Sequence, residues 1–169
     1  RGEGKGFFRH NLGPDSWKKF FFPPRRRLWA LRLRDGAFEA VGGEAATPRY
    51  ALIGPRACDL AALAIQDRVF RQPGGRDEHY LAAREAAFVV AVNCGQAAAT
   101  CFCDAMGTGP RCDAGFDLAL TEFADGDAHE FLVEHGTPAG EAMLASVPGR
   151  PAGEADLARA RAATTQARA

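Results

Sequence analysis

Two short, almost uninterrupted apolar runs, at residues 50–55 and 88–93, constrain the fold more than any other feature of this sequence. Apolar runs of this length, without polar alternation, are typical of strands buried on both faces, as in parallel sheets. The residues between them have helical spacing from about 57 to 70 and from 78 to 86, and Pro73-Gly74-Gly75 interrupts the two segments. A strand, two helices and a second strand predict a parallel pair, and therefore an α/β fold.

Alternating patterns predict the remaining strands. Residues 28–41 alternate around Asp35-Gly36, which is a typical hairpin turn sequence. Residues 116–121 and 130–134 are two further strand candidates, and 139–146 should form a short helix. We therefore expect a mixed sheet with flanking helices, and a cysteine- and glycine-rich loop at the ends of its strands.

The chain divides into three predicted parts. Residues 1–27 form an irregular basic-aromatic arm, rich in glycine and proline, which should bury Phe20–Phe22 against the domain or a partner. Residues 28–150 form the α/β domain. Residues 151–169, rich in alanine and arginine, form a helical tail.

Composition restricts the functional classes. The net charge is zero, which gives no argument for nucleic-acid binding, and no apolar run is long enough for a membrane span. The chain begins with neither a signal peptide nor an initiator methionine, so it is expected to be a fragment of a cytoplasmic protein.

Five cysteines are the residues most suited to chemistry. Their number is odd, and a disulfide between Cys101 and Cys103 would close a strained ring. Without a secretory signal, closely spaced cysteines favour metal or redox chemistry. Cys58 and Cys94 each follow a predicted buried strand, so parallel strands would place both at one edge of the sheet. The loop 95–100 is long enough to fold Cys101 and Cys103 back over that edge.

Several interpretations of these cysteines remain open. Four thiolates, from Cys58, Cys94, Cys101 and Cys103, match the ligand set of a [4Fe–4S] cluster, and zinc is the alternative metal. They could also be redox thiols or small buried core residues. Three neighbouring residues favour a bound cofactor: the backbone N–H groups of Gly107 and Gly109 would face an anionic cluster, and Arg56 would add positive charge. Cys112 lies outside this set.

No catalytic residue is predicted. A cysteine nucleophile needs a base nearby, and the histidines are scattered in polar, loop-like or surface contexts where solvation is expected. These are His10, His79, His129 and His135.

Six segments, in order along the chain, carry a resemblance to a known family. They are Lys19-Phe-Phe-Phe-Pro-Pro24, Gly54-Pro-Arg-Ala-Cys-Asp-Leu60, Asp67-Arg-Val-Phe70, Asn93-Cys94, Cys101-Phe-Cys-Asp-Ala-Met-Gly-Thr-Gly-Pro110 and Phe116-Asp-Leu-Ala-Leu-Thr121. Over roughly residues 18–140 the chain resembles the N-terminal region of the iron–sulfur β subunits of soluble nickel–iron hydrogenases (sulfhydrogenases). It is similar also to the corresponding subunit of anaerobic sulfite reductase.

The resemblance implies an electron-transfer subunit. Its partners would be a flavin- and nicotinamide-binding subunit together with a catalytic one, and a ferredoxin-like domain would follow the helical tail. The sequence departs from the family in containing no ferredoxin-type cysteine run. The alternative interpretation is a docking or scaffold domain without a cluster, in which the basic and aromatic residues of 7–34 bind partner subunits.

Overall fold

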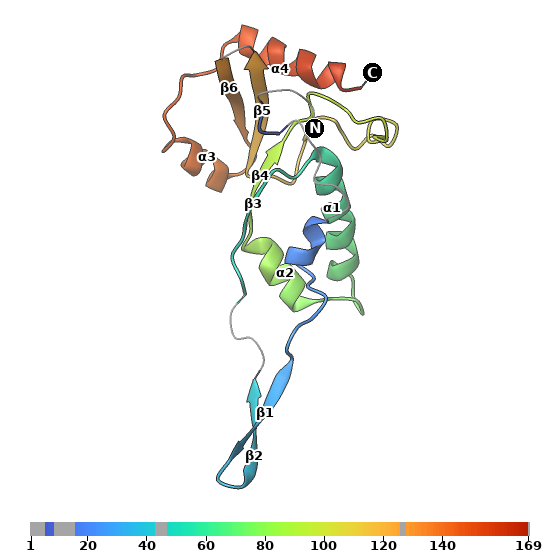
Figure 1. The fold of residues 1–169 in the computed structure, drawn as a ribbon, viewed down its shortest axis with the longest axis vertical. Helices are drawn as coiled ribbons and strands as arrows, with labels where there is room; N and C mark the ends of the chain where they lie inside the picture. Colours follow the sequence, from blue (N-terminus) through green and yellow to red (C-terminus); the bar gives the residue numbers. More distant parts are fainter. Residues whose placement is uncertain (1–5, 9–15, 43–46, 126–127, 169) are drawn as a thin grey trace.

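A four-stranded mixed sheet forms the centre of the domain (Figure 1). The computed structural model describes residues 6–8, 16–42, 47–125 and 128–168. The sheet has the order β3-β4-β5-β6, in which the first three strands are parallel and β6 is antiparallel to β5. The strands are β3 (Ala51–Ile53), β4 (Phe88–Val92), β5 (Leu118–Asp125) and β6 (Ala128–His135). The predicted α/β class, the mixed sheet and the parallel pair β3–β4 are confirmed.

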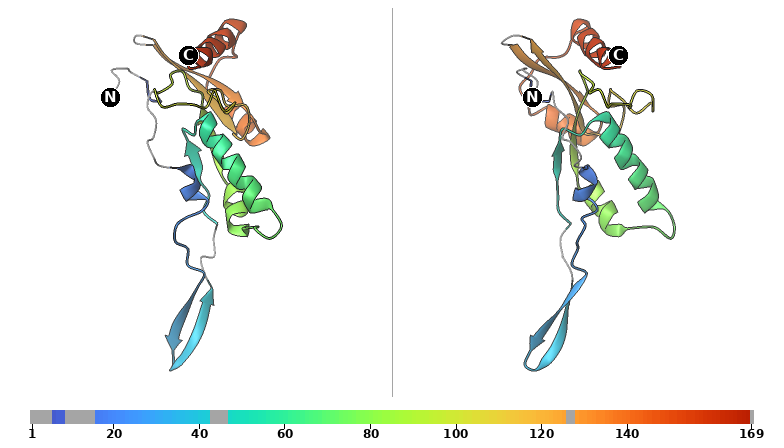
Figure 2. Two further views of the ribbon diagram at one scale, coloured as in Figure 1. Left: turned by 90° about the vertical axis from the view of Figure 1, so that its right-hand side faces the viewer. Right: turned by 45° about the vertical axis from the view of Figure 1, so that its right-hand side comes forward.

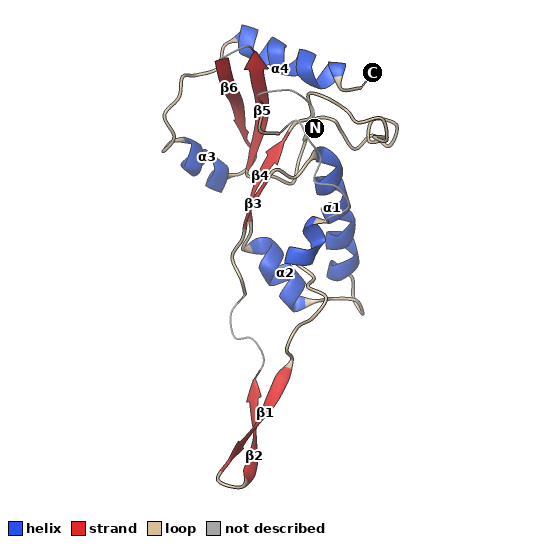
Figure 3. Ribbon diagram, viewed as in Figure 1, coloured by secondary structure: helices blue, strands red, loops and turns tan. Residues whose placement is uncertain are grey.

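Helices α1 (Ala57–Arg71) and α2 (Glu78–Glu85) connect β3 to β4, as predicted. The Asp77 side chain accepts a hydrogen bond from the Tyr80 backbone N–H and so caps α2. Tyr80 is fully buried, and its hydroxyl donates to the Asp67 carboxylate at 2.7 Å. Both helices are seen beside β3 and β4 in Figure 3. Their core cluster comprises Phe21, Leu52, Leu63, Tyr80, Leu81 and Ala83.

Strand β3 is not buried on both faces, and in this respect the prediction is wrong. Leu52 is buried in the cluster with Leu63 and Leu81, whereas Ala51 and Ile53 are exposed. Successive side chains of a strand point to opposite faces, so α1 and α2 cover only the face that carries Leu52. The apolar run at residues 50–55 therefore predicts a strand, but it does not indicate how many faces of that strand are covered by other elements.

A separate two-stranded hairpin, β1 (Trp29–Arg34) and β2 (Ala37–Gly42), confirms the predicted Asp35-Gly36 turn. Asp35 and Gly36 have φ angles of 50° and 80°, the left-handed pair that a two-residue hairpin turn requires. The hairpin projects from the rest of the molecule, as the views in Figures 1 and 2 agree.

The described part of the arm has little regular structure. A single 3₁₀ turn, η1 (Trp17–Phe20), is followed by Phe21, which is fully buried against Tyr80. Phe20 is partly buried beside Tyr50, but Phe22 stacks on Phe70 and stays 47% exposed. Phe22 is therefore not buried against the domain, and its burial against a partner stays a prediction; residues 9–15 of the arm lie outside the described residues.

Two helices complete the chain. Helix α3 (Pro138–Leu144) packs against β6, and α4 (Glu154–Gln166) lies in the predicted tail. Helix α4 buries Ala160 against Phe123 and Leu132, and the Arg159 guanidinium lies 4.0 Å from the centre of the Phe123 ring. None of the described helices is both long and apolar enough to cross a bilayer.

Candidate functional site

The ends of β3 and β4 meet at one edge of the sheet. The Gly54 N–H donates to the Val90 carbonyl at 2.9 Å, and the Val92 N–H donates to the Pro55 carbonyl at 2.9 Å, so the pairing continues past Ile53. Helix α1 begins directly afterwards, and the Asp59 carboxylate accepts the Arg56 backbone N–H at its first turn. Because the strands are parallel, Cys58 in that turn and Cys94 after β4 both follow strand ends at this edge.

Asn93 is the residue that holds the edge together. It is 5% exposed, and its side-chain amide donates to the Thr121 hydroxyl at 2.9 Å. Its side-chain oxygen accepts the Cys112 backbone N–H at 2.7 Å, and its own N–H donates to the Leu120 carbonyl. One side chain therefore joins β4, β5 and the returning end of the cysteine-bearing loop.

That loop, residues 94–112, is closed at its base and folded by local turns. The Cys94 N–H donates to the Pro110 carbonyl at 3.1 Å, which brings the two ends together. Within the loop, the Ala98 N–H lies 3.3 Å from the Cys101 sulfur, and the Thr108 N–H donates to the Cys103 carbonyl at 2.8 Å. These contacts join residues close in sequence, so the loop is folded into short-range turns, which its small residues favour.

Gly109 brings the loop against helix α1. A Cβ atom built at this position would lie 3.1 Å from the Cβ of Ala57 and 3.3 Å from the Cys103 sulfur. A side chain at this position would require Ala57 or Cys103 to shift by a few tenths of an ångström. The Cys103 thiol is consequently packed beside the first turn of α1, where Cys58 is located.

The thiols act on one another electrostatically. Cys58 is exposed as a residue, but partial burial of its thiol, the charge of Asp59, and the Cys94 and Cys103 thiols raise the pKa of Cys58 to about 11. Burial also raises the pKa of Cys94; Arg56 opposes this shift, and Cys103 and Cys101 add to it. At neutral pH Cys58 and Cys94 are therefore protonated thiols, and thiolate chemistry at this edge would require a cation to displace their protons.

Cys112 lies in the core rather than on the loop surface. It is 2% exposed, among Leu60, Val89, Ala91 and Ala119. Burial, followed by the charge of Cys94, raises its pKa to about 12. The sequence interpretation left Cys112 outside the site, and its surroundings are those of a small apolar core residue.

The donor set suits a thiolate-bound centre, but the side chains do not form one as they stand. All five cysteines are free thiols. Within the described parts of the chain, no three Cys, His, Asp or Glu side chains converge into a metal-binding group. Cys101 and Phe102 are exposed, so this part of the loop is accessible from solvent.

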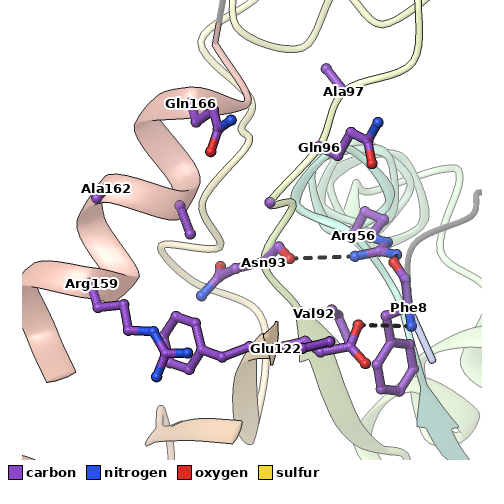
Figure 4. Close-up of a pocket in the computed structure, with 14 residues that line it drawn as sticks. Phe8, Arg56, Val92, Asn93, Gln96, Ala97, Glu122, Arg159, Ala162 and Gln166 are labelled. Atoms are coloured by element: carbon purple, nitrogen blue, oxygen red, sulfur yellow. Dashed lines mark hydrogen bonds between the residues drawn. The ribbon is translucent and has the colours of Figure 1, made fainter. Parts of the chain in front are cut away.

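A cleft of about 700 Å³ borders the cysteine loop (Figure 4). Gly95, Gln96 and Ala97 form its loop side, and it is lined also by Phe8, Arg56, Val92, Asn93, Glu122, Phe123, Ala124, Arg159, Ala162, Ala163 and Gln166. Arg56, which the sequence suggested as a charge beside the cysteines, donates to the carbonyls of Phe8 and Asn93. No sequence pattern indicated this cleft, because its walls come from the arm, β5, α4 and the loop.

Glu122 attaches the arm to the sheet beside this cleft. Its carboxylate accepts the backbone N–H groups of Phe7 and Phe8 at 2.6 and 2.9 Å, and it lies 2.7 Å from the His129 ring nitrogen. Burial raises the pKa of Glu122, but the hydrogen bonds from Phe8, His129 and Phe7 outweigh it and lower the pKa. His129 was expected at the surface and is exposed there, but it also packs against Phe7 and pairs with Glu122.

Chemically, the edge offers several neighbouring thiols, a glycine-rich loop and a nearby guanidinium. These groups suit the binding of a soft metal ion or a cluster, or thiol redox reactions. Glycine-rich backbone and a guanidinium would also favour negative charge at this position. Comparisons with protein-family models, with curated proteins and with solved structures find no match to this chain.

Proposed function

We propose that this chain is part of an electron-transfer iron–sulfur subunit of a multi-subunit oxidoreductase, such as a soluble hydrogenase or an anaerobic sulfite reductase. One observation supports the proposal most: Cys58 and Cys94 follow the ends of parallel strands at one edge of the sheet, and Cys103 lies near enough to raise the pKa of both thiols. The six-segment resemblance implies the same function. The five free thiols also suit a reducing compartment, so we propose a cytoplasmic location.

In this proposal Cys58, Cys94, Cys101 and Cys103 hold a [4Fe–4S] cluster, which when bound supplies a one-electron carrier. Residues of the chain would position the cysteine ligands for the cluster. Asn93 fixes the base of the loop, and Gly109 lets Cys103 approach α1. Cys101 is on an exposed segment, so the loop can bring it over the edge as the protons of the thiols are released.

Anaerobic reconstitution with iron and sulfide tests the proposal. We expect about four irons per chain and the charge-transfer absorption of a cluster. Cys101→Ser should remove most of the iron, whereas Cys112→Ala, which removes a cysteine outside the set, should retain it. Gly109→Ala is a second variant, expected to lose iron because its Cβ would press on Cys103. One zinc and no iron, or equal loss in Cys112→Ala and Cys101→Ser, would contradict a cluster at these residues.

A second candidate function is a cluster-free docking domain of the same kind of complex. The observation that favours it is the projecting hairpin, whose large apolar side chains are exposed. A chain with Cys58, Cys94, Cys101 and Cys103 all changed to serine distinguishes the two functions. Assembly into the complex without electron transfer supports the first function, and assembly with unchanged electron transfer supports the second.

A further inference from the structure

The β1–β2 hairpin has one wholly apolar face. In its register Leu31 lies opposite Ala40, and Leu33 lies opposite Phe38. Trp29 precedes Leu31 by two positions, so all five side chains are on the same face of the ribbon. Trp29, Leu31, Leu33 and Phe38 are each between 55% and 74% exposed, so none of the described elements covers this face.

A two-stranded ribbon with an exposed apolar face is stabilised when another surface packs against that face. An isolated two-stranded hairpin is marginally stable in water at best, and its apolar face gains stability only when it is removed from solvent. Trp and Phe are among the side chains that contribute most when they are buried at protein interfaces. In Figures 1 and 2 the hairpin extends away from the sheet and helices, where a second molecule can reach it.

Charge identifies the kind of partner. Residues 25–42 contain five arginines and only two carboxylates, those of Asp35 and Glu39. Arg32 and Arg34 project from the face opposite the apolar one, and Arg25 and Arg27 lie exposed at the base of the ribbon. The long arginine side chains can reach past the edges of the narrow ribbon, so a complementary surface has an apolar groove with Asp and Glu side chains along its rim.

We propose that the β1–β2 hairpin is a docking element that inserts its apolar face into such an acid-rimmed groove of a partner protein. Other occupants fit less well. Within the described residues, both edges of the ribbon present backbone N–H and C=O groups outside the ladder, which a protein groove can pair but the hydrocarbon of a membrane cannot. A second copy of the chain would bring together two segments that each carry five arginines and only two carboxylates, and this like net charge opposes the contact.

The proposal does not rest on the cysteines. Docking by the hairpin should be the same with or without a bound cluster, because the hairpin and the cysteine loop lie at opposite ends of the molecule in Figure 1. Iron content and partner binding are therefore separate readouts. A failure of one leaves the other unaffected.

Photo-cross-linking identifies the partner. A benzophenone amino acid is placed at Phe38 on the apolar face, and at Ile65 on α1 as the matched control, since Ile65 is also an exposed apolar residue. We expect a cross-link to one protein from position 38 and not from position 65. The cross-linked peptide should lie beside Asp or Glu residues.

The purified partner is then titrated with variants of the chain. Leu31→Ser should weaken binding by about tenfold or more, while Ile65→Ser should not. Arg32→Glu combined with Arg34→Glu should weaken binding and remove most of its salt dependence, whereas Arg161→Glu on exposed α4 should do neither.

Controls for the other occupants use phosphatidylcholine vesicles with and without phosphatidylglycerol, and the molar mass of the free chain in solution. Binding to anionic vesicles that is lost in Leu31→Ser would overturn the proposal in favour of a membrane surface. A dimer that is lost in the same variant would overturn it in favour of self-association. No cross-linked protein from position 38, or a partner affinity unchanged by both sets of substitutions, would also overturn it.

Discussion

Asn93 shows how much of the site depends on one residue. Its side chain both donates to Thr121 and accepts from Cys112, in a position that is 5% exposed. A buried amide that uses a donor and an acceptor cannot be replaced by a residue lacking either one without leaving a polar group unpaired. Asn93 is therefore the residue at which the loop and the sheet are most tightly coupled.

Changing Asn93 to alanine should destabilise the chain by about 1–3 kcal/mol, because the Cys112 N–H and the Thr121 hydroxyl lose their partner. Urea unfolding followed by circular dichroism measures this difference. Gln96→Ala, an amide removed from an exposed position of the same loop, should change the free energy of unfolding by less than about 0.5 kcal/mol. Equal effects of the two changes would mean that the amide hydrogen bonds of Asn93 are dispensable.

Cys112 predicts how stability depends on alkaline pH. Its pKa is raised from 9.0 to about 12, so the folded chain holds this proton more tightly than the unfolded chain does. The resulting stability is fully present below pH 9 and is lost as the pH rises from 9 to about 12. In Cys112→Ala the free energy of unfolding should fall less steeply over this window, by up to about 1.4 kcal/mol per pH unit.

The measurement is denaturant unfolding of the metal-free chain at several pH values. Cys101→Ala, the same change at an exposed position, is the matched control and should keep the wild-type slope. If the Cys112→Ala and wild-type slopes agree between pH 9 and 12, the thiol of Cys112 is not protected by its burial.

At the scale of elements, α3 is held in unusually close contact with the start of β5. Thr137 caps α3 by accepting the Gly140 N–H, and the same hydroxyl donates to the Asp117 carboxylate at 2.6 Å. A Cβ atom at Gly140 would lie 1.9 Å from the Asp117 carbonyl oxygen. The helix can therefore occupy this position only with glycine at 140.

Gly140→Ala should destabilise the chain by about 3 kcal/mol or more, because the obstructing atom is backbone and cannot rotate away. Thermal unfolding gives the value. Gly149→Ala is the matched control, since a Cβ atom there meets nothing within 4 Å. A Gly140→Ala chain as stable as the control would show that α3 can shift away from β5 without cost.

At the scale of the whole molecule, Glu122 connects the arm to the distant sheet. It lies on β5 and holds the backbone of Phe7 and Phe8, which also pack near His129 and Phe131. Hydrogen bonds from backbone N–H groups to a carboxylate are stronger than neutral ones. Glu122 therefore attaches the described start of the arm to the sheet, although it is more than a hundred positions from Phe7 and Phe8 in the sequence.

Glu122→Ala should release this attachment and leave the sheet folded. Chymotrypsin cleavage after Phe7 and Phe8 should become about tenfold faster or more, because the protecting hydrogen bonds are lost. Glu134→Ala removes a carboxylate on the neighbouring strand that pairs with Arg111, and it should leave cleavage unchanged. Equal cleavage rates in the two variants would contradict a role of Glu122 in holding the arm.

Local patterns predicted the elements of this fold because their causes are local. The Asp35-Gly36 turn needs two left-handed residues, and the break at Pro73-Gly74-Gly75 separates α1 from α2. The placement of β5 was less accurate, because the strand begins at Leu118 and not at 116. The Asp117 carboxylate accepts the Val89 N–H and the Thr137 hydroxyl, and no pattern in the sequence records these distant partners.

For the candidate site, the sequence predicted that Cys58 and Cys94 lie at one edge of the sheet but not how that edge is built. Cys58 and Cys94 could be placed because parallel strand ends share an edge. Three other features of the site depend on contacts between distant segments. They are the hydrogen bonds of Asn93, the close approach at Gly109 and the cleft beside Glu122. Because these contacts form only in the assembled fold, no spacing of residues in the sequence indicates them.

The connection between β4 and β5 has a consequence for the order of folding. Its residues, 93–117, are all described and contain no helix; they are mostly the cysteine loop itself. The segment from β3 to β4, with its two helices, can form early, and β5 with β6 can pair as sequence neighbours. Joining these two halves requires closure of a long loop, which is the entropically costly and therefore late step. The thiols of Cys58 and Cys103 become neighbours only in that step. An ion held by both thiols could therefore bind only after most of the fold has formed.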